Sequence, residues 1–335
     1  MRHFFSIIVP VYNRKEEVEE LLRSFQEQSY KNFEVVIVED GSTIPCKEVV
    51  NLFEKNISIQ YLYKENEGRS IARNKGMEMA RGDYFVFLDS DCFAPKEYLQ
   101  NLNENLSNHY VDCFGGKDMA HDSFSDLQKA INFSMTSFLT TGGIRGGKVR
   151  MEKFVPRSFN MGFSRETWEK VGGFREMFSE DIDISTRIHM KGCSISLLEN
   201  VEVYHRRRTS LRKFAHQVYV FGMSRITLKM LYPDSLKLVH CLPAVFLLGC
   251  IGLLVLSVFW KKVAIIPLVF YLFLLFISAL YSTKKIRIAS LSILTSMIQL
   301  CGYGAGFIQA FTEHILLKHQ RNTAKEKELR KGANE

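Results

Sequence analysis

Short apolar runs alternate with amphipathic stretches along the first part of the chain. Residues 4–11 and 33–38 are apolar and rich in β-branched side chains, and polar turn-forming residues end each run. Such runs are typical of buried parallel strands. Residues 14–28 lie between them and place apolar side chains at helical spacing. The same pattern predicts strands over 57–63 and 84–88 and a helix over 69–81.

This alternation predicts βαβ units and an α/β domain with a mainly parallel sheet covered on both faces. Further along, residues 165–192 predict two helices joined by a glycine turn, and 195–204 predict a strand that leads to His205. Residues 120–160 are less regular. Within them, 142–150 are rich in glycine and basic residues, which suits either a loop that closes over a diphosphate or a plain surface loop.

A long apolar region follows, from Leu238 to Phe311. It predicts transmembrane helices, because it contains segments close to the roughly 20 residues that cross a bilayer. None of these segments contains Asp, Glu, Lys or Arg. Only three residues, with Lys261 and Lys262 among them, separate the first two, so we expect a tight hairpin there. The segments cover residues 240–259, 263–281 and 289–311.

Four regions therefore follow one another. We expect a catalytic domain over 1–208, an amphipathic interface-helix region over 209–235, transmembrane helices over 236–312 and a basic polar tail over 313–335. Packing of the 211–231 helix on the catalytic domain is an equal alternative to an interfacial position. Every loop beside the apolar segments is basic, so the positive-inside rule does not decide their orientation. The number of spans, and a re-entrant or interfacial segment among them, therefore remain open.

The formal net charge of +8 has a large contribution from residues that flank the apolar region. Basic flanks beside apolar helices favour anionic membrane lipids as partners, and we expect no nucleic acid. The seven cysteines form no C-x-x-C pair, which argues against a disulfide framework or a structural zinc and suits a reducing compartment. No secretory apolar segment precedes residue 4. We therefore expect a multi-pass protein of the cell (inner) membrane with a cytoplasmic catalytic domain.

Polar residues follow several of the predicted strands at the point where each strand ends. Asn13, Asp40 and the pair Asp89 and Asp91 occupy such positions. The carboxyl ends of parallel strands share one edge of a sheet, where ligands bind, although Asn and Asp also simply form turns. Two carboxylates separated by one small residue suit Mg²⁺ or Mn²⁺, which bridges substrate phosphates. A D-x-D sequence alone is a weak signal.

A second acidic cluster begins a predicted helix. Glu180 and Asp181 are followed by Asp183. A catalytic carboxylate would suit this position, but the helix dipole by itself also favours acidic residues in a first turn.

In order along the chain, these blocks resemble the family 2 glycosyltransferases of GT-A fold, in particular membrane-anchored members of bacterial type. The resemblance covers about residues 4–205. The matching blocks are 6–13 (SIIVPVYN), 38–42 (VEDGS), 72–76 (ARNKG), 82–84 (GDY), 87–91 (FLDSD), 160–162 (NMG), 172–174 (GGF) and 180–181 (ED).

The resemblance implies a nucleotide-sugar donor and a divalent metal, Mn²⁺ or Mg²⁺. It places Asp91 as the direct metal ligand, Asp89 on the metal and the ribose, and His205 as an additional ligand. An isolated histidine at this position could equally be a surface residue. Cys92 stands where another acid often follows the D-x-D, which leaves the metal pair itself intact.

The resemblance also implies a nucleotide pocket and a catalytic base. Asp181, beside Glu180, resembles the general base that takes the proton of the acceptor hydroxyl. One departure is Glu39, where an Asp is more usual, so the longer side chain is expected to alter the nucleotide edge of the pocket. The implied nucleotide-sugar residues are Pro10, Tyr12, Asn13, Glu39, Asp40 at the base edge, Arg73 near the base or diphosphate, Asp89 and Ser90.

These residues predict an inverting, metal-dependent transfer of a sugar onto an acceptor hydroxyl, in polysaccharide or lipid-linked glycan biosynthesis. A processive polysaccharide synthase is the first alternative, but the chain has only Trp168 and Trp260, and neither lies in a Q-x-x-R-W block. Gln217 and Arg225 are the nearest counterpart. A catalytically inactive membrane scaffold is the second alternative, and the presence of both acidic clusters argues against it. A transporter is disfavoured because the predicted spans lack charges.

Overall fold

The computed structural model describes residues 2–119, 121, 123–142, 154–206 and 208–317. The chain forms two compact units: 1–121 with 154–206, and 122–153 with 207–335. The second unit thus includes 122–153, which the sequence pattern placed within the catalytic region. The glycine-rich basic stretch predicted as a candidate diphosphate loop lies outside the described residues, apart from Gly142.

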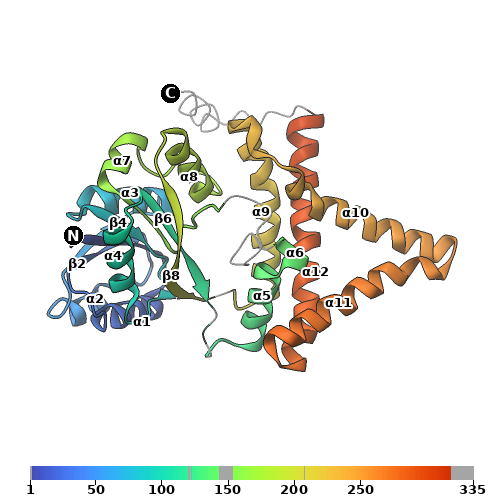
Figure 1. Ribbon diagram of the computed structural model, residues 1–335, viewed down its shortest axis with the longest axis horizontal. Helices are drawn as coiled ribbons and strands as arrows, with labels where there is room; N and C mark the ends of the chain where they lie inside the picture. Colours follow the sequence, from blue (N-terminus) through green and yellow to red (C-terminus); the bar gives the residue numbers. More distant parts are fainter. Residues whose placement is uncertain (1, 120, 122, 143–153, 207, 318–335) are drawn as a thin grey trace. The chain divides into compact units, whose positions relative to one another are not determined.

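The first unit is built on an eight-stranded sheet of order β3-β2-β1-β4-β7-β6-β8-β5 (Figure 1). Its first half is parallel, as predicted. In the second half, β7 runs antiparallel to both β4 and β6, and β8 is parallel to β6 and antiparallel to β5. The strands are β1 (Phe5–Val11), β2 (Phe33–Asp40), β3 (Ile59–Lys64), β4 (Tyr84–Phe87), β5 (Cys92–Phe93), β6 (Cys113–Met119), β7 (Met161–Ser164) and β8 (Ile195–His205).

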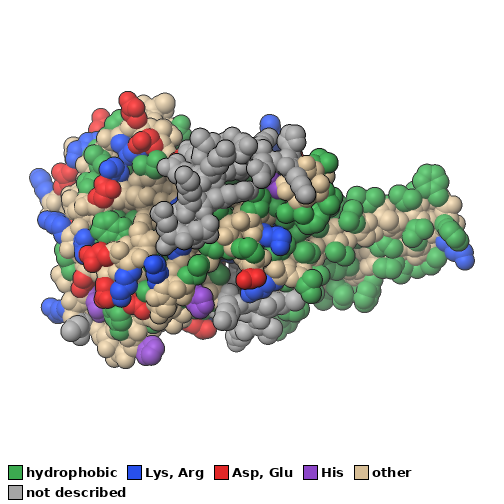
Figure 2. All heavy atoms as spheres, turned by 90° about the horizontal axis from the view of Figure 1, so that it is seen from above, with side chains coloured by type: hydrophobic (Ala, Val, Ile, Leu, Met, Phe, Trp, Pro, Cys, Tyr) green, Lys and Arg blue, Asp and Glu red, His purple; other side chains and the backbone are tan. Residues whose placement is uncertain are grey.

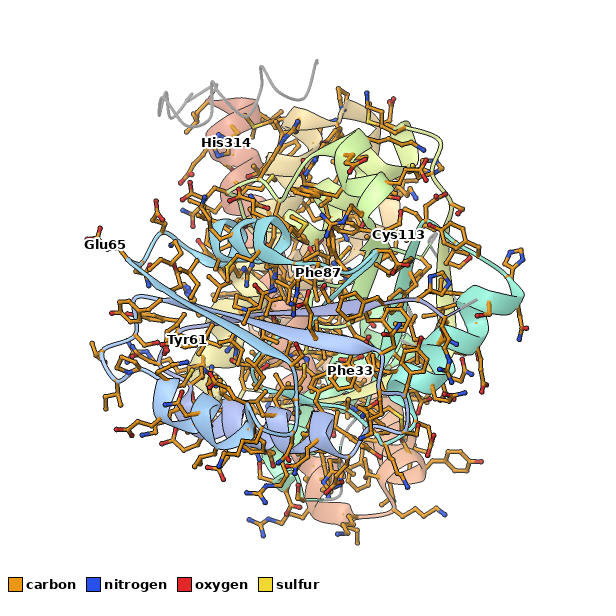
Figure 3. The ribbon with its side chains drawn as sticks, turned by 90° about the vertical axis from the view of Figure 1, so that its left-hand side faces the viewer. Phe33, Tyr61, Glu65, Phe87, Cys113 and His314 are labelled. Carbon is orange, nitrogen blue, oxygen red and sulfur yellow. The ribbon has the colours of Figure 1, made fainter. Side chains whose placement is uncertain are left out.

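Helices cover both faces of this sheet because alternate strand residues point to opposite sides. One core contains Ile7 and Val35 with residues of α1 (Lys15–Gln26), α2 (Lys47–Phe53) and α4 (Tyr98–Asn108). The other contains Ile8 and Phe87 with residues of α3 (Arg69–Met79), α7 (Arg165–Val171) and α8 (Glu180–Met190). Figure 3 shows Phe87 among the side chains of the interior and Glu65 at the outer edge, in the loop after β3. The mixed α/β architecture predicted from the sequence is confirmed.

The second unit is helical. Among its described residues, three helices are long and apolar enough to cross a membrane: Leu238–Phe259, Lys262–Thr283 and Ile286–Leu316. Its elements are α5 (Asp126–Thr136), α6 (Phe138–Thr141), α9 (Leu211–Leu231), α10 (Leu238–Phe259), α11 (Ile266–Thr283) and α12 (Ile286–Phe311). Short helical turns accompany them at Pro233–Ser235, Lys262–Ile265 and Thr312–Leu316.

The helix predicted for the membrane interface, α9, packs along α12. A Cβ added to Gly306 would lie 2.0 Å from the carbonyl oxygen of Tyr219, so the two backbones touch where the side chain is absent. The buried side chains of Phe214 and Val218 form one apolar cluster with Ile131 of α5. The apolar stripe of α9 is therefore used within its own unit, and α5 joins this unit by the same contacts.

Candidate active site

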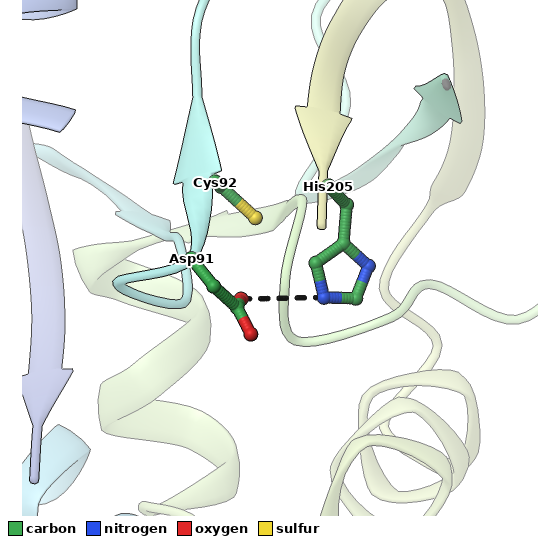
Figure 4. A group of neighbouring side chains, drawn as sticks. All are labelled: Asp91, Cys92 and His205. Atoms are coloured by element: carbon green, nitrogen blue, oxygen red, sulfur yellow. Dashed lines mark ion pairs between the residues drawn. The ribbon is translucent and has the colours of Figure 1, made fainter. Parts of the chain in front are cut away.

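The D-x-D turn follows β4 at the carboxyl edge of the sheet. Leu88 donates its backbone N–H to Ile8, and Cys92 donates to the carbonyl oxygen of Asp89 at 3.0 Å, which closes the turn. The chain then enters β5, where Cys92 pairs with His205 of β8. This strand pair places the carboxylate of Asp91 beside the imidazole, with Oδ1 3.3 Å from Nε2 (Figure 4).

Further groups surround this carboxylate–imidazole pair. The ring of Phe159 stacks on His205 with centroids 4.5 Å apart. Asp118 on β6 places Oδ2 4.0 Å from Nδ1 of the same imidazole. Sequence reasoning missed Asp118 because no local pattern predicted β6, and the strand reaches the site only through its pairing with β8. Asp91, His205 and Cys92 form a group whose ligand atoms lie within 4.8 Å of one another.

Cys92 is the least suited member of this group to bind a hard metal ion. Burial, together with the charges of Asp91 and Asp89, raises the pKa of its thiol well above the ordinary value. Its Sγ lies 3.6 Å from the carbonyl oxygen of Phe159, to which it donates. Carboxylate oxygen and imidazole nitrogen, in contrast, are ligands that Mn²⁺ accepts. The donor set of Asp91 and His205 therefore fits the predicted metal.

Arg73 connects the two acidic motifs. Its guanidinium is fully buried. Nη2 donates to Asp89 Oδ1 at 2.7 Å and to Ser158 Oγ at 3.1 Å. Nη1 donates to Glu180 Oε1 at 2.9 Å. The resemblance placed Arg73 near the base or diphosphate, whereas its two Nη groups here join the end of β4 to the start of α8.

The two neighbouring carboxylates at the start of α8 have different surroundings. Glu180 accepts from Arg73 through Oε1 and from Arg69 through Oε2, at 2.8 Å, and its side chain is 2 % exposed. Asp181 accepts the backbone N–H of Ile182 at 2.9 Å and lies 3.5 Å from Arg157, with its side chain 15 % exposed. Asp181 is thus the more accessible carboxylate.

Asp40 fixes the loop that precedes α3. Its Oδ1 accepts from Lys64 Nζ at 2.6 Å and from the backbone of Glu67 at 3.0 Å, and Oδ2 accepts from Gly68 N at 2.8 Å. The next residue is Arg69, whose side chain remains 55 % exposed while it holds Glu180. Arg69 is a cation of the site that the motif blocks did not single out.

Asn13 joins the loops that follow β1 and β2. It has φ +52°, and its Oδ1 accepts from the N–H and the hydroxyl of Thr43 at 2.8 and 2.9 Å. Beside it, Tyr12 is 51 % exposed at the carboxyl edge of the sheet. Pro10 is half-buried on β1, and Ser90 is buried in the D-x-D turn.

The side chain of Glu39 points into the interior on the face of the sheet opposite that of Asp40, because neighbouring residues of a strand point to opposite sides. It is fully buried. Oε2 accepts from Cys46 N at 2.8 Å and from the Tyr61 hydroxyl at 2.5 Å. Burial and the bond to Glu39 raise the pKa of Tyr61. The extra methylene of Glu39 thus reaches partners beneath the loop, a role different from the nucleotide contact that the resemblance implied.

Arg14, after β1, is a second cation that sequence reasoning missed. Burial lowers the pKa of its guanidinium, but the hydrogen bond to Glu17 and the charges of Asp91 and Asp89 raise it overall. Its Nη1 donates to Glu17 at 2.6 Å. A positive group therefore stands within the electrostatic reach of the D-x-D carboxylates.

Known proteins resemble this chain in sequence and in fold. The model of the family described as glycosyl transferase family 2 matches residues 6–191. Glycosyltransferase AglE of Haloferax volcanii is 26 % identical over 264 residues, which are 73 % of this chain and 81 % of that protein. An uncharacterized glycosyltransferase of Haemophilus influenzae is 40 % identical over 126 residues, 37 % of this chain and 48 % of its own length. One of Rickettsia felis is 42 % identical over 95 residues, 28 % of this chain and 16 % of its own length.

Two of these three curated relatives are thus matched over less than half of their own length. Among solved structures, a mannosyltransferase of Pyrobaculum calidifontis, PcManGT, in complex with GDP-Man and Mn²⁺, has the same fold. The TM-score is 0.59 at 17 % identity, and the match covers 93 % of this chain and 88 % of that one.

Proposed function

The chain belongs to glycosyl transferase family 2, and on that premise we propose that it moves a sugar from a nucleotide-sugar donor to an acceptor hydroxyl. The transfer is metal-dependent and inverts the anomeric centre in one in-line displacement. Two sets of contacts carry this proposal. Asp91 lies beside His205 as a candidate metal-ligand pair. In the same D-x-D turn, Asp89 contacts Arg73, which also holds Glu180 at the start of the helix that contains Asp181.

Asp91 and His205 would hold Mn²⁺ or Mg²⁺, with Asp89 next to them. When bound, the metal supplies positive charge to the diphosphate of the donor. The chain adds its own cations at the same edge: the charges of both D-x-D carboxylates act on Arg14, and Arg69, which is half exposed, pairs with Glu180. Positive groups fixed before the reaction stabilise the charge that grows on a leaving nucleoside diphosphate.

Asp181 is the proposed general base. A hydroxyl becomes a competent nucleophile when a positioned carboxylate accepts its proton during the attack. The backbone N–H of Ile182 fixes one carboxylate oxygen of Asp181 at 2.9 Å and Arg157 approaches the other at 3.5 Å. Glu180 was also a catalytic candidate. Both of its oxygens accept from arginines, so we assign it, with Arg73, the role of a positioning residue.

The nucleotide would lie at the loops after β1 and β2. Tyr12 offers an exposed ring there, and Asn13 and Asp40 hold the loops in place. We assign Pro10 and Ser90 to the same pocket. Glu39 acts from beneath, through Cys46 and Tyr61.

The acceptor proposed is lipid-linked or another glycan precursor at the cytoplasmic face of the cell membrane. Three helices long and apolar enough to span a bilayer follow the catalytic unit in sequence. Exposed basic residues at the start of α9, Arg212 and Lys213, suit anionic head groups. A membrane-bound acceptor would therefore meet an enzyme that is anchored in the same surface.

The test is titration of detergent-purified full-length chain with GDP-, UDP- and dTDP-sugars, with and without Mn²⁺. One donor should bind only with metal, and Asp91→Asn should abolish that binding. Asp181→Asn should still bind the donor but lower the turnover number by about 10²–10⁴-fold. Asp234→Asn, at an exposed aspartate of the second unit, is the matched control and should change neither quantity. Absence of binding for every donor and metal would contradict the transferase and favour a scaffold.

A further inference from the structure

In the second unit, α10 and α11 leave α12 at different points and meet at their far ends (Figure 1). α10 touches α12 at Gly304, where an added Cβ would lie 2.5 Å from the carbonyl oxygen of Pro243. α11 packs near the other end of α12, with Leu275 and Ala279 in one cluster with Ala289. The α12 positions 289 and 304 are separated by about 22 Å at 1.5 Å per residue. α12 is thus the base of a triangle whose other sides are α10 and α11.

The two converging helices are more exposed than α12. In an 18-residue apolar stretch of α10, and in one of Lys262–Thr283, 11 % of the residues are buried, against 44 % in the corresponding stretch of α12. Figure 2 shows hydrophobic side chains along the projecting hairpin and basic ones at its far end, where the chain carries Lys261 and Lys262. The 22 residues of α10 extend about 33 Å, close to the roughly 30 Å of a bilayer's hydrocarbon core.

α12, in contrast, is covered by helices that carry charges. Its Thr295 donates to the carbonyl oxygen of Ala130 on α5 at 3.0 Å. α9 packs on the following turns of α12. A Cβ added to Gly302 of α12 would lie 2.8 Å from Cγ2 of Val218 on α9. α9 also carries exposed basic residues, Arg212 and Lys213.

The triangle restricts which helices can cross one flat bilayer. If α12 stood across the membrane, the charged α9 beside it would lie at hydrocarbon depth. The hairpin would then run sideways, with Lys261 and Lys262 away from either surface. Both placements carry a large cost for charged groups. If the hairpin crosses instead, its two lysines reach the far head groups, and α12 lies along the near surface.

We propose that the chain crosses the bilayer twice, through α10 and α11, and that α12 lies along the membrane surface with α5 and α9. Both ends of α12 are then on the side from which the hairpin enters. Leu317 and the catalytic unit therefore share one side of the membrane. The positive-inside rule favours the cytoplasmic side for the basic residues that follow in sequence. The segment predicted as a third span is an interfacial helix.

Single cysteines test this topology in the full-length chain. Lys262→Cys marks the end of the hairpin, Leu317→Cys the end of α12, Lys285→Cys the α11–α12 connection, and Glu65→Cys an exposed loop of the catalytic unit. Spheroplasts of the expressing cells are treated with a membrane-impermeant maleimide before and after lysis. The unsubstituted chain measures labelling of the native cysteines, and retained membrane localisation shows that each variant is assembled.

The proposal requires Lys262→Cys to react in intact spheroplasts, and the other three variants to react at least about tenfold more after lysis. Three crossings would make Leu317→Cys react in intact spheroplasts together with Lys262→Cys, while Lys285→Cys stays protected. A hairpin that enters only one leaflet would leave all four protected until lysis. Either of these two outcomes would overturn the proposal.

Discussion

Arg73 donates from Nη1 to Oε1 of Glu180 at 2.9 Å, and both side chains are closed to solvent. The same guanidinium holds Asp89 at 2.7 Å. The start of α8 and the end of β4 are therefore tied by one buried cation. A change in this arginine should consequently affect the stability of the unit as well as catalysis.

Arg73→Ala should lower the free energy of unfolding by about 3–5 kcal/mol, because the buried carboxylate of Glu180 loses one of its two arginines and Asp89 loses its ion pair. Thermal or denaturant unfolding of the detergent-purified chain measures this loss. Arg23→Ala is the matched control: it removes an exposed pair with Glu19 and should cost about 0–1 kcal/mol. Equal losses in the two variants would show that the Arg73 contacts contribute no more than a surface pair.

The metal assignment predicts different effects for neighbouring residues. His205→Ala should raise the Mn²⁺ concentration that half-maximal donor binding requires by at least about tenfold. Loss of a supporting metal contact typically costs this much or more in metal affinity. Cys92→Ala should retain that dependence, because a neutral buried thiol is a poor partner for a hard cation. Donor titrations over a Mn²⁺ series measure both. Loss of metal dependence in Cys92→Ala alone would assign the thiol as a ligand.

The carboxylate of Glu34 predicts a pH dependence of stability. Burial raises its pKa, but hydrogen bonds from the Arg81 backbone, Ser6, the Arg81 guanidinium and Gln60 lower it below the ordinary value overall. The folded-state pKa is thus below the unfolded one. The ionised group therefore contributes stability that is complete above the unfolded value, about 4.3, and is lost as the pH falls through the folded value.

Glu34→Gln should accordingly lower the free energy of unfolding by about 1–3 kcal/mol at pH 7. The difference from the unsubstituted chain should shrink as the pH falls below about 4. Unfolding curves across this pH range measure it. Glu54→Gln, which removes a half-exposed partner of Lys47, should change the stability by at most about 1 kcal/mol. A Glu34→Gln deficit that stays constant with pH would contradict the linkage.

The contact between α9 and α12 predicts that replacing glycine by alanine destabilises the protein at one position of the helical unit and not at another. At Gly306 an added Cβ would lie 2.0 Å from the Tyr219 carbonyl oxygen, whereas nothing lies within 4 Å of one at Gly252. Gly306→Ala should therefore cost about 1–3 kcal/mol from overpacking. Gly252→Ala should be neutral or slightly stabilising, since alanine favours a helix. Thermal unfolding in detergent compares the two, and equal midpoints would mean that the close approach does not exist.

The local pattern of the sequence determined the secondary structure of the parallel half of the sheet and the positions of its polar loops. Runs such as 33–38 are long enough and apolar enough to form buried strands wherever they lie. The turn after each run places Asp40 or Asp91 at a strand end, and parallel pairing brings these ends together. The C-terminal apolar helices followed from length and composition alone.

The tertiary structure decided what each polar side chain contacts. Asp118 came to His205 through the pairing of β6 with β8, which no local pattern encodes. Glu39 reached Tyr61 because β2 pairs with β3 in a register that puts both side chains on one face of the sheet. Arg73 was enclosed because α8 returned against the end of β4. These contacts join residues far apart in sequence, so they depend on packing, whereas strand and helix signals depend on neighbours along the chain.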